Sequence, residues 1–158
     1  MGKGDNLFQL MDVYDLSEGI YACLTKDEKA VNDIFNLGAK EYRTIREDFQ
    51  SVLDFAGHGK RIVSFPIKPA LFALELLYHL KLSPVYKWNY GTAYVESFTS
   101  IEKAEKVLGF KPRYSNKDAL IRNYKWYLEN KANFGKATGV SHRVPWDQGV
   151  WKFAKIFF

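Results

Sequence analysis

Apolar residues recur at helical spacing in three parts of the chain, and each part opens with the same start signal. A capping side chain stands three residues before an acidic one in Asp15-Leu-Ser-Glu18, Thr44-Ile-Arg-Glu47 and Ser115-Asn-Lys-Asp118. In this capping-box pattern the two side chains satisfy free N–H groups at the start of a helix. The pattern therefore predicts three capped helices, and Gly57 is a suitable residue to end the second.

The remaining apolar runs are shorter and of two kinds. Phe8–Val13, Asp33–Leu37 and Arg61–Phe65 are brief, and Gly or Pro follows closely after the last two, as expected of strands joined by tight connections. Strands alternating with helices indicate an α/β or α+β arrangement. Ile67–Leu80 is apolar nearly all round but too short to span a bilayer, which predicts a buried or partner-facing helix.

The stretch "SIEKAEKVLGFKPRYS" contains a complete set of helix stop and start signals. Ser100 is a suitable N-cap, and Gly109 allows the left-handed turn that ends a helix. Phe110 stands where a hydrophobic residue packs back on the last helical turn, and Pro112 prevents the helix from continuing. The pattern predicts two short helices on either side of an aromatic residue that locks the turn.

The chain changes character near residue 131, which divides it into a globular region of residues 1–130 and a tail of residues 131–158. The tail begins as a Gly-rich polar loop and ends in "VWKFAKIFF". Nine residues cannot hold a helix alone in water. Val150–Phe158 therefore docks on its own domain, or it contacts a membrane surface or another subunit.

Composition narrows the choice of environment and partner. The chain has 158 residues, 47% of them hydrophobic, a net charge of +5, and basic residues spread without a run, which favours a solvated surface over a nucleic-acid interface. Cys23 is the single cysteine, so no intrachain disulfide forms and a cytoplasmic location is expected. The three histidines stand far apart, and no metal-ligand spacing occurs.

Four stretches together resemble the C-terminal part of the extended short-chain dehydrogenase/reductases, the NAD-dependent epimerase/dehydratase family. "FQLMDVYDLSEGIYACL" is similar to the family's strand and Val-x-Asp-Leu helix start, and "NDIFNLGAKEYRTIRED" to its Phe-Asn-x-Gly strand end and Thr-capped helix. "GKRIVSFP" resembles the next strand, and "SIEKAEKVLGFKPRYS" the Lys-Ala-…-Leu-Gly-(aromatic)-x-Pro signature. The resemblance implies a C-terminal substrate-binding lobe of α/β class with mixed α+β character, made of short strands and several capped helices without the N-terminal Rossmann half.

In that family the Rossmann half supplies a Gly-rich loop for NAD(P) and a catalytic Tyr-x-x-x-Lys pair. Gly57-His-Gly59-Lys60 lacks the third glycine and follows a helix, and Tyr127 to Lys131 lies beyond the signature on the wrong side of the family order. We therefore expect no catalytic, cofactor-binding or metal-binding residue in this chain, and NAD(P) only in a full-length parent. The missing Rossmann region is the implied partner, and a homo-oligomer is a further expectation.

The resemblance also locates a substrate site. The sugar-nucleotide members hold the diphosphate with arginines ahead of the Val-x-Asp-Leu and Lys-Ala motifs, and the corresponding regions here contain none. The candidate substrate contacts lie in these two regions of the chain and are Phe8, Gln9, Tyr86, Lys87, Trp88 and Tyr90. The aromatic members suit a more apolar hydroxyl or ketone compound at least as well as a sugar nucleotide, and ordinary packing is the alternative explanation.

The resulting functional prediction is the substrate-binding portion of an oxidoreductase, isomerase or lyase of this family, catalytically incomplete alone. The rival from another class is a non-catalytic ligand- or membrane-surface-binding module that uses the aromatic surface and the tail. A small-molecule substrate is the expected ligand, and nucleic acid is not expected.

Overall fold

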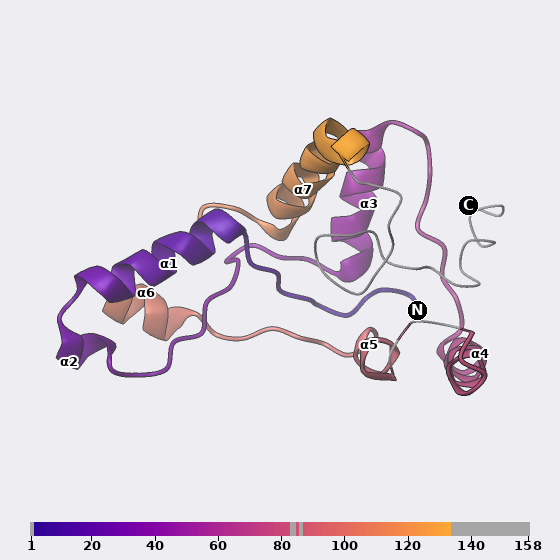
Figure 1. Cartoon of the computed structure of the whole chain (residues 1–158), viewed down its shortest axis with the longest axis horizontal. Coiled ribbons are helices and arrows are strands. Elements are labelled where there is room, and N and C mark those ends of the chain that lie inside the picture. Colours follow the sequence, from indigo (N-terminus) through magenta and orange to yellow (C-terminus); the bar gives the residue numbers. More distant parts are fainter. Residues whose placement is uncertain (1, 83–84, 86, 134–158) are drawn as a thin grey trace. The chain divides into compact units, whose positions relative to one another are not determined.

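The computed structural model describes residues 2–82, 85 and 87–133, and its regular elements over these residues are helices (Figure 1). The tail segment 150–158 predicted to dock lies outside the described residues. The elements are α1 (Val13–Thr25), α2 (Glu28–Val31), α3 (Ile45–Ala56), α4 (Ile67–His79), α5 (Lys87–Thr92), α6 (Glu102–Leu108), α7 (Asn116–Asn130) and the short 3₁₀ helix η1 (Lys131–Asn133).

The α/β expectation is wrong over the described residues, because none of the three predicted strands forms. Extended pairing is limited to isolated bridges, which join Gly2 to Phe65, Leu7 to Thr44, and Phe8 to Ser97. A strand needs a neighbour that continues the ladder of backbone hydrogen bonds. Here the N–H of Leu10 instead donates to the side chain of Asn116, at 2.8 Å.

The chain divides into two compact units. One unit comprises Met1–Lys3, Ser64–Val95 and Trp126–Phe158, and the other comprises Gly4–Val63 and Glu96–Lys125. We call the first the α4 unit and the second the α1 unit, each after the longest helix that lies wholly within it. The α1 unit also contains α2, α3, α6 and most of α7, whereas the α4 unit contains α5.

The core of the α1 unit is built around the predicted helix stop. Ile101, Ala104, Leu108 and Phe110 form the buried cluster, and Cys23 is among the half-buried residues that pack against it. Gly109 has a φ of 67°, in the left-handed region, and the N–H of Phe110 donates to the carbonyl of Ala104 at 3.2 Å. These contacts confirm the prediction that Phe110 packs back on the last turn of the helix.

The start of α6 differs by one position from the prediction. The helix begins at Glu102 with Ile101 at the N-cap, and the predicted cap Ser100 lies one residue earlier. Its hydroxyl oxygen still accepts a hydrogen bond from the N–H of Glu102, at 3.3 Å.

Two of the three predicted capping boxes form. Thr44 and Glu47 cap each other's backbone at the start of α3, which ends at Gly57 with φ 74°. Ser115 and Asp118 do the same at the start of α7.

The first predicted box is wrong. The N-cap of α1 is Asp12, whose carboxylate accepts a hydrogen bond from the N–H of Tyr14 at 2.9 Å. Asp15 therefore lies inside the helix, and it is 1% exposed.

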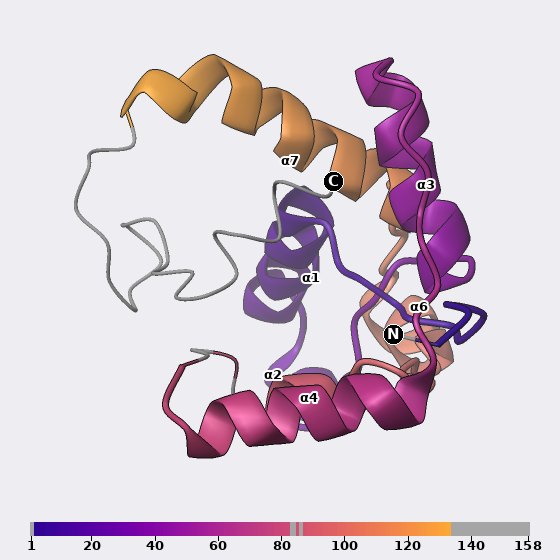
Figure 2. The ribbon, with the colours of Figure 1, turned by 90° about the vertical axis from the view of Figure 1, so that its right-hand side faces the viewer.

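In the α4 unit, the predicted apolar helix forms but is not buried. None of the residues of α4 is buried, and Phe72 is 71% exposed. α4 packs against α5, and an ion pair of 3.3 Å joins Glu75 of α4 to Lys87 of α5. Figure 2 shows α4 along its length. Over the described residues, no helix has both the length and the hydrophobicity needed to cross a membrane.

Candidate functional site

Two of the motifs that carry the family resemblance meet inside the α1 unit. Asp15 of the Val-x-Asp-Leu motif accepts hydrogen bonds through Oδ2 from the backbone N–H groups of Arg113 and Tyr114, both at 3.0 Å. These two residues directly follow the Leu-Gly-Phe-Lys-Pro signature, 98 and 99 positions along the chain from Asp15. The carboxylate thus fixes the path of the chain where it leaves the signature.

The second oxygen of Asp15 faces the side chain of Arg113. Asp15 Oδ1 is buried without a hydrogen-bond partner among the described residues, and the Nε atom of Arg113 lies 3.8 Å away. A second carboxylate, that of Glu18, lies 3.6 Å from Nη2 of Arg113. A buried carboxylate is costly unless paired, so the guanidinium and the two backbone donors together explain how Asp15 is tolerated.

A second buried carboxylate belongs to a network centred on Asn116. The side-chain amide of Asn116 donates to Asp48 at 2.8 Å and to the carbonyl of Phe8 at 2.6 Å, and its oxygen accepts from Leu10. Arg43 pairs with Asp48 at 3.2 Å. Every polar atom of this amide side chain is engaged, so the network holds the structure together rather than presenting a reactive group.

The N-cap carboxylate of α1 is held by an arginine from α7. Nη1 of Arg122 lies 2.7 and 2.8 Å from the two oxygens of Asp12. The guanidinium also lies over the rings of Tyr114, at 3.9 Å, and Tyr14, at 4.8 Å. Stacking between two rings leaves the guanidinium little freedom to turn toward a ligand.

The predicted substrate residues Phe8 and Gln9 lie in the α1 unit, where both have structural contacts. Gln9 donates through Nε2 to the carbonyl of Ala39 at 2.7 Å, and its Oε1 accepts from the N–H of Thr99 at 2.9 Å. Its backbone N–H donates to Ser97. A substrate would have to displace these partners, so the contacts favour a role for Gln9 in joining three segments.

The other predicted substrate residues that the structure describes, Lys87, Trp88 and Tyr90, belong to the α4 unit, so the described candidates are divided between the two units. Trp88 is 75% exposed, whereas Tyr90 is 5% exposed with a hydroxyl that has no partner among the described residues. Lys87 pairs with Glu75, and Tyr86 lies outside the described residues. Trp88 is therefore the predicted contact with the most free surface.

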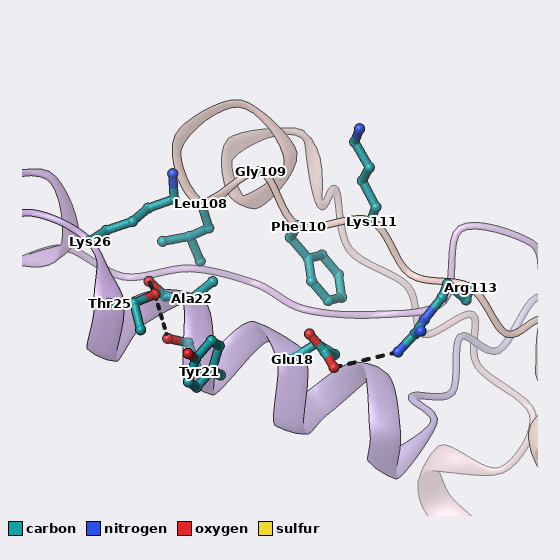
Figure 3. Close-up of a pocket in the computed structure, with 10 residues that line it drawn as sticks. All are labelled: Glu18, Tyr21, Ala22, Thr25, Lys26, Leu108, Gly109, Phe110, Lys111 and Arg113. Atoms are coloured by element: carbon teal, nitrogen blue, oxygen red, sulfur yellow. Dashed lines mark hydrogen bonds and ion pairs between the residues drawn. The ribbon is translucent and has the colours of Figure 1, made fainter.

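The α1 unit also has a pocket that sequence reasoning missed. It has a volume of about 280 Å³ and lies between one face of α1 and the segment that follows α6 (Figure 3). The lining residues are Glu18, Tyr21, Ala22, Thr25, Lys26, Leu108, Gly109, Phe110, Lys111 and Arg113. The sequence signal was the presence of basic residues at two chain reversals, Lys26 after the first helix and Lys111 after the Gly109 stop, but nothing local indicated that the two reversals meet.

Shifted pKa values occur at helix caps and in surface ion pairs. Hydrogen bonds from Thr44 lower the pKa of Glu47, and those from Ser115 lower the pKa of Asp118. The hydrogen bond from Lys103 lowers the pKa of Asp33, and the one to Glu105 raises the pKa of Lys40. Within the described ranges, no three His, Cys, Asp or Glu side chains gather closely enough to hold a metal ion.

The chain is similar to a longer bacterial protein. It is 37% identical over 148 residues to the uncharacterized protein y4nG of Sinorhizobium fredii (strain NBRC 101917 / NGR234), a match that covers 92% of this chain and 36% of that protein. The chain thus spans about a third of the length of this relative, whose name states no activity. No protein-family model matches the sequence. No solved structure matches it significantly.

Proposed function

We propose that this chain is the substrate-binding portion of an NAD-dependent epimerase/dehydratase-like oxidoreductase and requires a dinucleotide-binding half for catalysis. The observation that carries the proposal is the Asp15 junction. Two motifs that resemble the family in sequence are joined by a buried carboxylate and two backbone hydrogen bonds of 3.0 Å. Motifs brought together by chance would have no reason to share a buried polar contact, which costs free energy unless its geometry is satisfied.

The dinucleotide-binding half would supply NAD(P) and the groups that transfer hydride and protons. This chain would supply the surface that orients the substrate, with Trp88 as the most exposed of the predicted contacts at 75%. An indole face suits a flat or apolar hydroxyl or ketone compound. Neither region that holds a diphosphate in the sugar-nucleotide enzymes contains an arginine here, so we propose the apolar compound over the sugar nucleotide.

The relative y4nG offers the direct test, because about two thirds of its length lies outside the match. We expect purified full-length y4nG to bind NADH, measured as saturable enhancement of nicotinamide fluorescence, and the 158-residue chain alone to give no enhancement. Absence of NAD(H) and NADP(H) binding by y4nG would overturn the proposal. Binding of either cofactor by the isolated chain would also contradict it.

A second candidate is a non-catalytic module that binds a membrane surface. It is favoured by the exposed apolar residues of the α4 unit, among them Phe72 at 71% and Trp88 at 75%. The test is flotation of the whole chain with anionic liposomes, before and after deletion of residues 148–158. Flotation that the deletion abolishes supports this candidate, and no flotation at low salt rules it out.

A further inference from the structure

We propose that the pocket between α1 and the Leu108–Arg113 segment binds a phosphomonoester carried on a small apolar or aromatic body. The pocket shares no residue with the predicted substrate contacts and does not depend on the oxidoreductase proposal. Its volume of about 280 Å³ is just below the range of roughly 300–1,000 Å³ typical of sites for drug-sized ligands. A ligand with one ring or a short acyl chain fits that size.

The floor of the pocket is apolar and rigid. Leu108 and Phe110, 3% and 4% exposed, belong to the core cluster of the α1 unit. The left-handed turn at Gly109 and the hydrogen bonds of Asp15 to the following backbone hold this wall in place. The opposite wall comes from α1, where Tyr21 is 64% exposed and can cover an aromatic ligand. Such a floor accounts for the apolar part of the ligand.

The rim of the pocket is basic. It contains Lys26 at the end of α1 and Lys111 and Arg113 on the other wall, against the single carboxylate of Glu18 (Figure 3). Arg113 is already paired with Glu18 and Asp15. Among the described residues, neither Lys26 nor Lys111 has an ion pair. In Figure 3 the side chain of Lys111 extends away from α1, and that of Lys26 comes from the end of α1. Each ammonium group is carried on a flexible stem that can turn toward the mouth of the pocket, and together the two match the charge of a phosphomonoester, which is close to −2 at neutral pH.

The test uses phenyl phosphate as the probe and follows amide resonances of the whole chain. We expect saturable shifts confined to residues 18–26 and 108–113, with a dissociation constant on the order of 1 mM or lower at low salt. Inorganic phosphate lacks the apolar part and phenol lacks the charge, so each should bind at least several-fold more weakly. Absence of saturable shifts up to about 10 mM phenyl phosphate would overturn the proposal.

Variants of the rim separate a specific site from general attraction to a basic chain. Lys26→Gln and Lys111→Gln should each weaken binding on the order of tenfold, since each removes a charge-assisted contact. Glu18→Gln should tighten binding several-fold because it removes the repelling carboxylate and releases Arg113. The control Lys29→Gln/Lys117→Gln makes the same charge change outside the pocket. If it weakens binding as much as the double variant Lys26→Gln/Lys111→Gln does, the site is rejected.

A lipid headgroup and a soluble metabolite can both present the phosphomonoester. Sedimentation with phosphatidylcholine vesicles containing phosphatidic acid distinguishes them. Binding to these vesicles that Lys26→Gln/Lys111→Gln abolishes would support the site and assign the lipid source. Binding of phenyl phosphate without vesicle binding would support the site and assign a soluble source.

Discussion

The α1 unit and the α4 unit differ in how far their polar and apolar side chains are buried. In the α1 unit four polar side chains are at least nine-tenths buried, Asp12, Asp15, Asp48 and Asn116, and each has a named hydrogen-bond partner. In the described part of the α4 unit, Tyr90 is the one buried residue, and α4 leaves its apolar side chains half-buried or exposed.

This difference shows that the two units are specified in different ways. The α1 unit is held by contacts between residues far apart in sequence, such as Asp15 with the backbone 98 residues later. The helices of the α4 unit follow from local spacing, and the described residues cover little of their apolar surface. Substitutions in the α1 unit should therefore cost more free energy of unfolding than substitutions on the exposed face of α4.

Removal of the Asp15 carboxylate should cost the α1 unit about 3 kcal/mol of free energy of unfolding. The Asp15→Ala change leaves two partly buried backbone donors without an acceptor and Arg113 without its buried partner. Urea unfolding followed by circular dichroism measures the loss. The control is Asp33→Ala, which removes an exposed ion pair with Lys103 and should have little effect. Equal losses in the two variants would contradict the structural role of Asp15.

Addition of one methyl group at Gly38 should cost about 1–3 kcal/mol. A Cβ atom there would lie 2.5 Å from Cδ and 2.6 Å from Nε2 of Gln9, whose amide is held by Ala39 and Thr99. The Gly38→Ala variant must move that amide off its partners. The control is Gly91→Ala in α5 of the α4 unit, where nothing lies within 4 Å and alanine should stabilise the helix by up to about 1 kcal/mol.

The parts of the fold that were predictable are those in which a signal and its target are close in sequence. The caps at Thr44 and Ser115, the stop at Gly57 and the turn at Gly109 each act within a few residues, and all four form. Phe110 was also predictable, because a residue that follows such a stop packs on the turn it has just left. Local hydrogen-bonding rules suffice for these features.

The features that could not be predicted depend on distant partners. The spacing of Asp15 and Glu18 matches a capping box, yet Asp12 caps the helix, and the Asp15 carboxylate instead accepts hydrogen bonds from Arg113 and Tyr114. Gln9 was expected to contact a substrate, but its amide serves Ala39 and Thr99. The extended segments form isolated backbone bridges instead of continuous ladders, so the described structure is helical where an α/β arrangement was expected.

Loss of the cap at the start of α7 should have a smaller cost, about 1 kcal/mol at neutral pH. Ser115→Ala removes the oxygen that accepts from the N–H of Asp118 at 3.2 Å and donates to its carboxylate at 2.6 Å. The hydrogen bond from the Ser115 hydroxyl, together with a second from the Ser115 backbone N–H, lowers the pKa of Asp118, so the stabilising contribution of this carboxylate is present above the ordinary aspartate pKa and is lost as pH falls through the lowered value.

The pH dependence gives this prediction a second readout. Between about pH 6 and pH 3 the wild-type chain should lose more stability than Ser115→Ala, because the variant keeps the backbone hydrogen bond to the Asp118 carboxylate but has lost the hydroxyl hydrogen bond, the larger cause of its lowered pKa. Urea midpoints measured at several pH values check this. The box of Thr44 and Glu47 stays intact in both proteins and serves as an internal reference. Parallel pH curves would show that Ser115 does not influence Asp118.

The smallest effect is expected on the exposed face of α4. Phe72 is 71% exposed, so Phe72→Ser removes little buried apolar area and should change the free energy of unfolding by less than about 0.5 kcal/mol. Urea unfolding of the whole chain at micromolar concentration measures the change.

A cost above about 2 kcal/mol would instead show that this face is covered in solution, because only burial makes the loss of a phenyl ring that expensive. If that cost grows with protein concentration, the cover is a second copy of the chain, since only an associating partner makes stability depend on concentration. Either large result would remove the contrast between the two units, because the apolar side chains of α4 would then be buried like those around Phe110.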